Sequence, residues 1–135
     1  MNDFFASYKQ AAWEKDFQTM TSLYDKEIVI FDMWDDGFLT DFETWAKIIK
    51  EWLGSLGDER VQVDFENVKI QESGDTGFAH ALIGFKAISA DGEVLRSMKN
   101  RISLGFMKRS DGWKVVHQHT SAPVSSSDLS AVLDI

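Results

Sequence analysis

The stretch Ser110-Asp111-Gly112-Trp113-Lys114-Val115-Val116-His117-Gln118-His119-Thr120-Ser121-Ala122-Pro123 decides the fold. Its first three residues have tight-turn chemistry, and a strand rich in β-branched residues follows them. Strict alternation along a strand places every second side chain on the same face. It therefore predicts one row made of Trp113, Val115, His117, His119 and Ser121. Two histidines and a tryptophan in one such row are an unusual feature of a small domain.

The composition describes one globular domain. At 135 residues, 44% hydrophobic and 27% charged, the chain can bury a core of its own. It has no cysteine, which excludes disulfides, thiolate zinc sites and cysteine nucleophiles. The net charge of -8 argues against a nucleic-acid partner. No leader and no segment of membrane-spanning length are recognised, so a cytoplasmic protein without a membrane partner is expected.

The first half of the chain has helical periodicity. Apolar residues at helical spacing predict a helix over 4–13, and Asp16 is expected to begin a second, short helix. Residues 28–33 are β-branched and aromatic, as in a buried strand. A third helix is predicted over 42–56, with Thr40 and Glu43 at the spacing of a capping box.

The second half has the pattern of strands joined by glycine-containing turns. The predicted strands cover 61–71, 77–89, 94–108 and 113–122. Residues 128–135 have one apolar face, which predicts a helical tail within 126–135 that closes the pocket or caps a neighbour. The whole chain, 1–135, is thus expected to be a single α+β domain, with N-terminal helices packed on a curved antiparallel sheet.

Three segments carry a family resemblance: Phe31-Asp32, Arg101-Ile102-Ser103, and Asp111-Gly112-Trp113 followed by 116–123. With these segments and this element order, the chain resembles the nuclear transport factor 2-like superfamily, which includes ketosteroid isomerase. Within it, the likeness is to the SnoaL-like branch related to the association domain of calcium/calmodulin-dependent protein kinase II. The resemblance implies a cone-shaped, cystatin-like fold, a conical pocket, and homodimers built through the outer sheet face. It implies no single chemistry, because the fold hosts isomerases, cyclases, dehydratases and assembly modules.

The resemblance also separates the two faces of the sheet. If the family's hairpin register holds, Val116, Gln118 and Thr120 face the pocket. The outer, interface-forming face then carries Arg101, Ser103, Trp113, His117, His119 and Ser121. A slip of one residue would exchange the two faces.

The histidine pair has two interpretations. Alternate strand residues could hold a metal ion if His80 or Asp32 supplied a third ligand. Alternatively, both rings form hydrogen bonds with Ser103, Arg101 or Ser121. A lone pair is an incomplete coordination shell, so no metal and no cofactor are expected.

The pocket is expected to be mostly apolar. In the kinase-associated relatives arginines bind small anions there; Leu82, Leu104 and Thr120 stand at those positions in an ungapped alignment. The predicted ligand-binding residues are Phe31, Met33, Trp34, Trp45, Leu82, Leu104, Gln118 and Thr120, with Tyr8 beside them. The alternative for each aromatic residue is ordinary core packing.

Acid–base chemistry is the catalytic hypothesis. Ketosteroid isomerase uses a carboxylate base with an oxyanion hole made of a tyrosine and a protonated aspartic acid. Asp32 and Tyr8 are counterparts for two of these roles, and the third has none. Asp32 follows Phe31 and precedes Met33, so desolvation could make it a base; alternatively it is a strand-end residue in water.

Two functions follow from these observations. The first is a dimeric SnoaL-like domain that binds a small, mostly apolar molecule. If it is an enzyme, it is a cofactor-independent isomerase, cyclase or dehydratase in which Asp32 is the base and Tyr8, Gln118 or Thr120 donates hydrogen bonds. The alternative is a non-catalytic dimerisation or assembly module.

Overall fold

The computed structural model describes all residues from 1 to 135. Three helices come first in the chain, interrupted by two strands, and four long strands follow. The helices are α1 (Asn2–Glu14), α2 (Phe17–Ser22) and α3 (Phe42–Gly54). The strands are β1 (Tyr24–Phe31), β2 (Phe38–Leu39), β3 (Arg60–Ser73), β4 (Thr76–Ile88), β5 (Val94–Arg109) and β6 (Gly112–Ser121). None of the helices is long and apolar enough to span a membrane.

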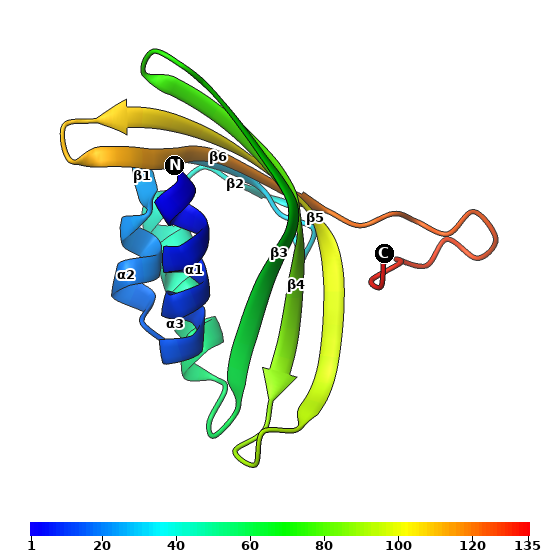
Figure 1. The fold of residues 1–135 in the computed structure, drawn as a ribbon. Helices are drawn as coiled ribbons and strands as arrows, with labels where there is room; N and C mark the ends of the chain where they lie inside the picture. The colour runs from blue at the N-terminus through cyan, green and yellow to red at the C-terminus, as the bar shows by residue number, and fades with distance from the viewer.

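The strands form one six-stranded sheet in the order β2-β1-β6-β5-β4-β3. It bends around the helices, which all lie on its concave side (Figure 1). The predicted α+β architecture is confirmed, with one correction to the strand directions. β1 runs parallel to β6, whereas the other pairs are antiparallel, so the sheet is mixed. Pairing of β1 with a strand more than eighty residues away leaves no local signal in the sequence.

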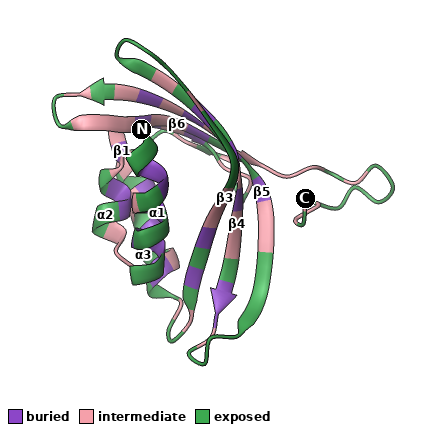
Figure 2. Ribbon diagram, in the orientation of Figure 1, coloured by how far each residue is buried: buried purple, intermediate pink, exposed green.

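The core lies between the helices and the concave face of the sheet, and Figure 2 colours the buried residues of these elements purple. Helix α1 contributes its predicted apolar stripe, in which Phe4 meets Phe106 of β5 edge to face at 5.6 Å between ring centroids. Phe5 meets Phe65 of β3 in the same way at 4.9 Å. Edge-to-face pairs add stabilisation beyond the burial of their area. These contacts fix α1 against the sheet.

Helix α3 begins one residue later than the predicted capping box requires. The N-cap is Asp41, whose Oδ1 accepts a hydrogen bond from the backbone N–H of Glu43 and whose Oδ2 accepts one from the hydroxyl of Thr44. Aspartate is as good an N-cap as threonine, and its charge also suits the positive end of the helix dipole. Thr40 therefore lies outside the helix.

Two β-bulges bear on the shape of the sheet around the helices. In β3, Asn67 and Val68 lie opposite one residue of β4, and Asn67 has a positive φ of 56°. In β6, Val116 is the extra residue between Val115 and His117, which pair with the adjacent residues Phe106 and Gly105. A bulge bends its strand and interrupts the alternation of side chains.

The C-terminal segment is not helical, contrary to the prediction for 126–135. It leaves the end of β6 and loops outward before returning to β5 (Figure 1). Val124 and Ala131 form an isolated bridge, and the carbonyl of Leu133 accepts a hydrogen bond from the backbone N–H of Lys99. The segment thus pairs with the part of the β5 edge that β6 leaves free. The segment makes these contacts as extended chain, so the helical spacing of its apolar residues did not predict its structure.

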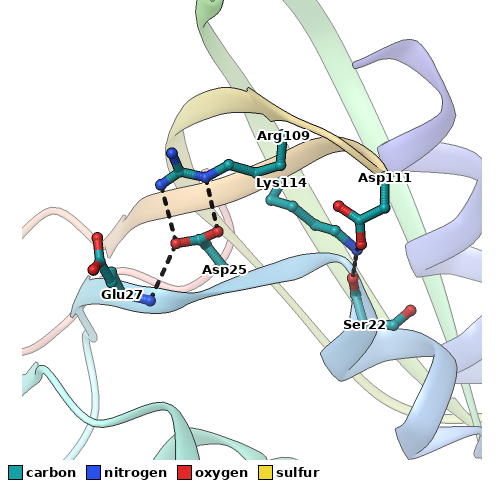
Figure 3. A network of polar contacts seen from close by, with 6 residues as sticks. All are labelled: Ser22, Asp25, Glu27, Arg109, Asp111 and Lys114. Atoms are coloured by element: carbon teal, nitrogen blue, oxygen red, sulfur yellow. Dashed lines mark hydrogen bonds and ion pairs between the residues drawn. The ribbon is translucent and has the colours of Figure 1, made fainter.

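An ion pair joins the start of β1 to the end of β5 (Figure 3). The Asp25 carboxylate accepts hydrogen bonds from Arg109 Nε at 3.0 Å and Nη2 at 3.2 Å. It also accepts one from the backbone N–H of Glu27. The Asp25 side chain is 14% exposed. The hydrogen bonds from Arg109 are the largest cause of its lowered pKa.

We expect Asp25→Asn to destabilise the protein at neutral pH and not in acid. The folded-state pKa of Asp25 lies below the unfolded value of about 3.9, so its contribution is present above that pH and is lost as the pH falls through the folded pKa. At pH 7 a loss of about 1 kcal/mol, or roughly 4 °C in Tm, is expected. Thermal unfolding at pH 7 and in acid measures both. Asp111→Asn is the control: its contact with Lys114 is exposed and should contribute close to nothing. A destabilisation by Asp25→Asn that persisted unchanged in strong acid would contradict this account.

Candidate functional site

A cavity of about 390 Å³ lies between the concave face of the sheet and the helices. Cavities that hold small organic ligands occupy about 300–1,000 Å³. Helix α3 supplies one wall with Trp45, Ile48, Ile49 and Trp52. Inward-facing residues of β3, β4 and β5 supply the opposite wall, namely Val61, Ile83, Phe85, Ala87, Met98, Asn100 and Ile102. Most of the lining is therefore apolar, which suits a ligand with an apolar skeleton.

Asp32 brings a carboxylate to the cavity. It follows the last residue of β1, and the loop to β2 holds its backbone, since Asp32 N–H donates to the carbonyl of Gly37 at 3.0 Å. Thr120 of β6 is its side-chain partner: the hydroxyl donates to Asp32 Oδ1 at 3.3 Å and accepts from the backbone N–H of Met33 at 3.1 Å. The carboxylate is half-buried and has no cationic partner. No basic side chain of the protein therefore competes with a bound molecule for it.

Tyr8 of helix α1 lines the same cavity. Burial raises the pKa of its hydroxyl above the ordinary range, and the negative charge of Asp32 raises that pKa further. The hydroxyl therefore stays protonated at neutral pH. No protein group accepts a hydrogen bond from it, so it remains available as a donor to a ligand.

Gln118 is held in one orientation by Tyr24. The buried Tyr24 hydroxyl donates a hydrogen bond to Gln118 Oε1, and burial raises the pKa of Tyr24 well above the ordinary range. Because the amide oxygen is occupied by Tyr24, the amide nitrogen is the end left for the cavity that Gln118 lines. Tyr24 thus sets which atom of Gln118 a ligand meets.

Most of the predicted pocket residues line the cavity. They are Tyr8, Asp32, Met33, Trp34, Trp45, Gln118 and Thr120. Four predictions are wrong. Val116 is the extra residue of the β6 bulge and does not line the cavity. Phe31 and Leu82 lie on the outer face, where Phe31 contacts His117 and Leu82 pairs with Arg101. Leu104 faces inward but is buried in the core behind the cavity, at 1% exposed.

The predicted outer-face residues lie as expected, with one exception. Arg101, Ser103, His117, His119 and Ser121 share the outer face, on the register Arg101–Ser121 and Ser103–His119. The single row predicted from Trp113 to Ser121 is interrupted at Val116, because the bulge adds a residue to the strand there. Val115 is consequently buried on the inner side, and Trp113 packs against the core.

The histidines make structural contacts on that face. His117 Nδ1 lies 2.7 Å from the carbonyl of Val29, and the rings of His117 and His119 meet Phe31 at 4.9 and 5.3 Å between centroids. The protein brings no third His, Asp or Glu side chain to the pair. The predicted hydrogen bonds from both rings to Ser103, Arg101 or Ser121 are not formed: His117 pairs with Val29 instead, and Arg101 Nε donates to the hydroxyl of Ser121.

Several residues of the cavity were not predicted from the sequence, and Asn100 is the most informative of them. Its neighbours in the inner row of β5, Met98 and Ile102, are apolar. A polar residue between them could have indicated a position that lines a cavity. Trp52 was visible as part of the apolar stripe of α3, but nothing in its spacing distinguished a cavity wall from core. Arg96 lies at the start of the same inner row of β5, and Lys86 alternates with Phe85 and Ala87 on β4; local spacing did not distinguish either from an exposed strand residue.

The fold and the cavity can be compared with those of known proteins. The family model of the SnoaL-like domain matches residues 1–125. An NTF2-like protein of unknown function from Pseudomonas putida KT2440 is similar in structure, with a TM-score of 0.84, 20% identity, and coverage of 99% of this chain and 92% of the other. Aln2 from a Streptomyces species has a TM-score of 0.76 at 14% identity, over 89% and 85% of the two chains. A Xanthomonas campestris protein named for the calcium/calmodulin-dependent protein kinase II association domain has a TM-score of 0.68 at 13% identity, over 90% and 81%. No curated protein sequence matches the chain.

These likenesses define the class as an NTF2-like, cystatin-like fold, which confirms the predicted cone-shaped architecture. The match over residues 1–125 is more specific. The chain belongs to the SnoaL-like domain family.

Proposed function

We propose that this SnoaL-like domain binds a small, mostly apolar molecule in the cavity and transfers a proton on it without a cofactor. The observation that supports the proposal is one carboxylate, Asp32, in an otherwise largely apolar cavity that also contains the donors Tyr8 and Gln118. In the proposed reaction Asp32 takes a proton from a carbon next to a carbonyl group. The electron pair of that C–H bond moves to the carbonyl oxygen, where the Tyr8 hydroxyl and the Gln118 amide stabilise the negative charge. Asp32 then returns the proton to carbon.

Ligand binding is tested by filling the cavity. Met98→Trp places a larger side chain at a lining position, so we expect its affinity for the bicyclic probe 1-tetralone to fall at least about tenfold in calorimetry. Leu95→Trp is the control, since Leu95 is exposed on the same strand and does not line the cavity. Thermal unfolding of both variants verifies that they fold. Equal binding by wild type and Met98→Trp would place the probe elsewhere and refute the proposed site.

A second function, assembly, rests on the outer face of the sheet. Strand register places two rows side by side there: Phe78–Gly105–His117–Val29, and His80–Ser103–His119–Phe31–Phe38. Phe31, Phe38 and Phe78 are 41%, 59% and 47% exposed. Monomeric proteins seldom expose contiguous apolar patches of this kind, so we propose that a second copy of the chain covers this face. A homodimer of this form is compatible with ligand binding, because the cavity lies on the other side of the sheet.

A further inference from the structure

Two buried polar atoms in the protein have no hydrogen-bond partner, and both belong to residues that line the cavity. One is Nε1 of Trp45, on helix α3; the other is Oδ1 of Asn100, on strand β5. The two residues are 5% and 2% exposed. The other buried side-chain nitrogen and oxygen atoms of the chain are paired.

An unpaired polar group inside a protein is unfavourable, because it gives up its hydrogen bonds to water and gains none in return. Phenylalanine in place of Trp45 and leucine in place of Asn100 would fill similar volumes without that cost. The two atoms belong to opposite walls of one cavity and to segments distant in the sequence. Both atoms are closed to solvent in the unliganded protein, so a bound molecule that turns the two side chains toward the cavity and pairs with them accounts for both unpaired groups together.

The chemistry of the two atoms specifies complementary groups. The indole N–H can only donate, so it requires an acceptor; the amide oxygen can only accept, so it requires a donor. Both ligand groups are neutral, since an ion at these depths would need a counter-charge. Among the charged residues that line the cavity, Arg96 is paired with Glu59 at 2.7 Å, Lys86 is exposed to solvent, and Asp32 has the wrong sign for an anion.

We infer that the ligand is a neutral molecule with an apolar skeleton that carries an oxygen acceptor for Trp45 and a hydroxyl group that donates to Asn100. This inference rests on the proposed binding of a small molecule in the cavity, and it makes Trp45 and Asn100 the residues that set the specificity. In a ligand with one carbonyl group, Trp45 adds a donor to the carbonyl oxygen on which Tyr8 acts, and Asn100 accepts a hydrogen bond from a second oxygen group.

Four bicyclic probes that differ only in their oxygen groups test the inference: tetralin, 1-tetralone, 5,6,7,8-tetrahydro-2-naphthol and 6-hydroxy-1-tetralone. Calorimetry should show that 6-hydroxy-1-tetralone binds most tightly and tetralin least. Each satisfied group should tighten binding roughly threefold to tenfold, the range expected of a neutral hydrogen bond.

Two substitutions then identify the side chains that cause the preference for oxygenated probes. Trp45→Phe keeps the aromatic wall and removes the N–H, so it should reduce the preference for the oxygenated probes over tetralin. Asn100→Leu should remove the preference for the hydroxylated probes. Trp13→Phe is the matched control: it makes the same change at an exposed indole that does not line the cavity, and should leave the preference intact. Both test variants should also unfold at the same or a higher temperature than wild type without ligand, because each removes an unpaired group.

The outcomes separate this inference from the proposed function. Binding of all four probes with equal affinity, or a preference unchanged in Trp45→Phe and Asn100→Leu, would overturn the inference and leave ligand binding in place. Binding of none of the four probes would overturn the proposed function and the inference with it.

Discussion

Asp32→Asn is expected to slow exchange of the α-hydrogens of 1-tetralone by roughly 10²–10⁴-fold, the usual contribution of a positioned general base. The amide has nearly the shape of the carboxylate and can still accept the hydrogen bond of the Thr120 hydroxyl, which holds Asp32 Oδ1. It cannot take up a proton from carbon. Proton NMR in D₂O follows the loss of the α-hydrogen signal with the wild-type protein and the variant at equal concentration.

The control for this experiment is Asp36→Asn. Asp36 lies in the same loop, is exposed and does not line the cavity, so the same change of charge should leave the exchange rate unaltered. Binding of 1-tetralone to Asp32→Asn, measured separately, distinguishes lost catalysis from lost affinity. A wild-type protein that binds the probe and does not accelerate exchange would refute the catalytic part of the proposal and leave the binding part standing. Wild-type exchange in Asp32→Asn would refute the role of Asp32.

Local periodicity predicted most of the architecture. The apolar stripe of α1, the short helix after Asp16 and the glycine-containing turns of the three long hairpins are all present. These features depend on neighbouring residues, so a single sequence contains their signal. The parallel pairing of β1 with β6 and the extended C-terminal segment depend on contacts between distant residues. No local pattern could predict them.

The residues of the candidate site were predictable where side chains alternate regularly along β6. Gln118 and Thr120 were assigned correctly to the cavity because the strand is regular beyond His117. Trp113 was assigned to the wrong face because the bulge at Val116 shifts the alternation by one residue. Both residues before that point, Trp113 and Val115, face inward. A bulge has no reliable sequence signature, so the observed register was needed to correct the row.

The wrong placement of Phe31 has a similar cause, because side-chain alternation stops where the strand ends. Phe31 and Trp34 are close in sequence and similar in hydropathy, yet β1 ends between them. Phe31 is the last residue of the strand and faces outward, whereas Trp34 lies in the following loop and lines the cavity. Hydropathy does not show which of the two residues faces the cavity. The position at which β1 ends determines it.

Phe31→Glu is expected to weaken self-association at least about a hundredfold, so that a homodimer sediments as a monomer. Phe31 lies within the outer-face rows, where its ring contacts Phe38, His117 and His119 at 4.9 to 5.8 Å. In a two-fold dimer the substitution introduces a carboxylate into both copies of the same patch. Burying such unpaired charges costs several kcal/mol, which sets the size of the effect. Analytical ultracentrifugation over a range of concentrations measures it.

Val94→Glu is the matched control, because Val94 is 57% exposed at the start of β5 and does not belong to either row. It adds the same charge to a chain whose net charge is already -8, so general repulsion between copies is the same in both variants. A shift to monomer in Phe31→Glu alone therefore locates the interface on the outer face. A wild-type protein that is monomeric at every concentration would refute assembly through this face. A dimer that survives in Phe31→Glu would place the interface elsewhere and leave the exposed aromatic rows without a partner. Because the cavity lies on the concave side, the monomeric variant should still bind 1-tetralone, and loss of that binding would show that the two functions depend on each other.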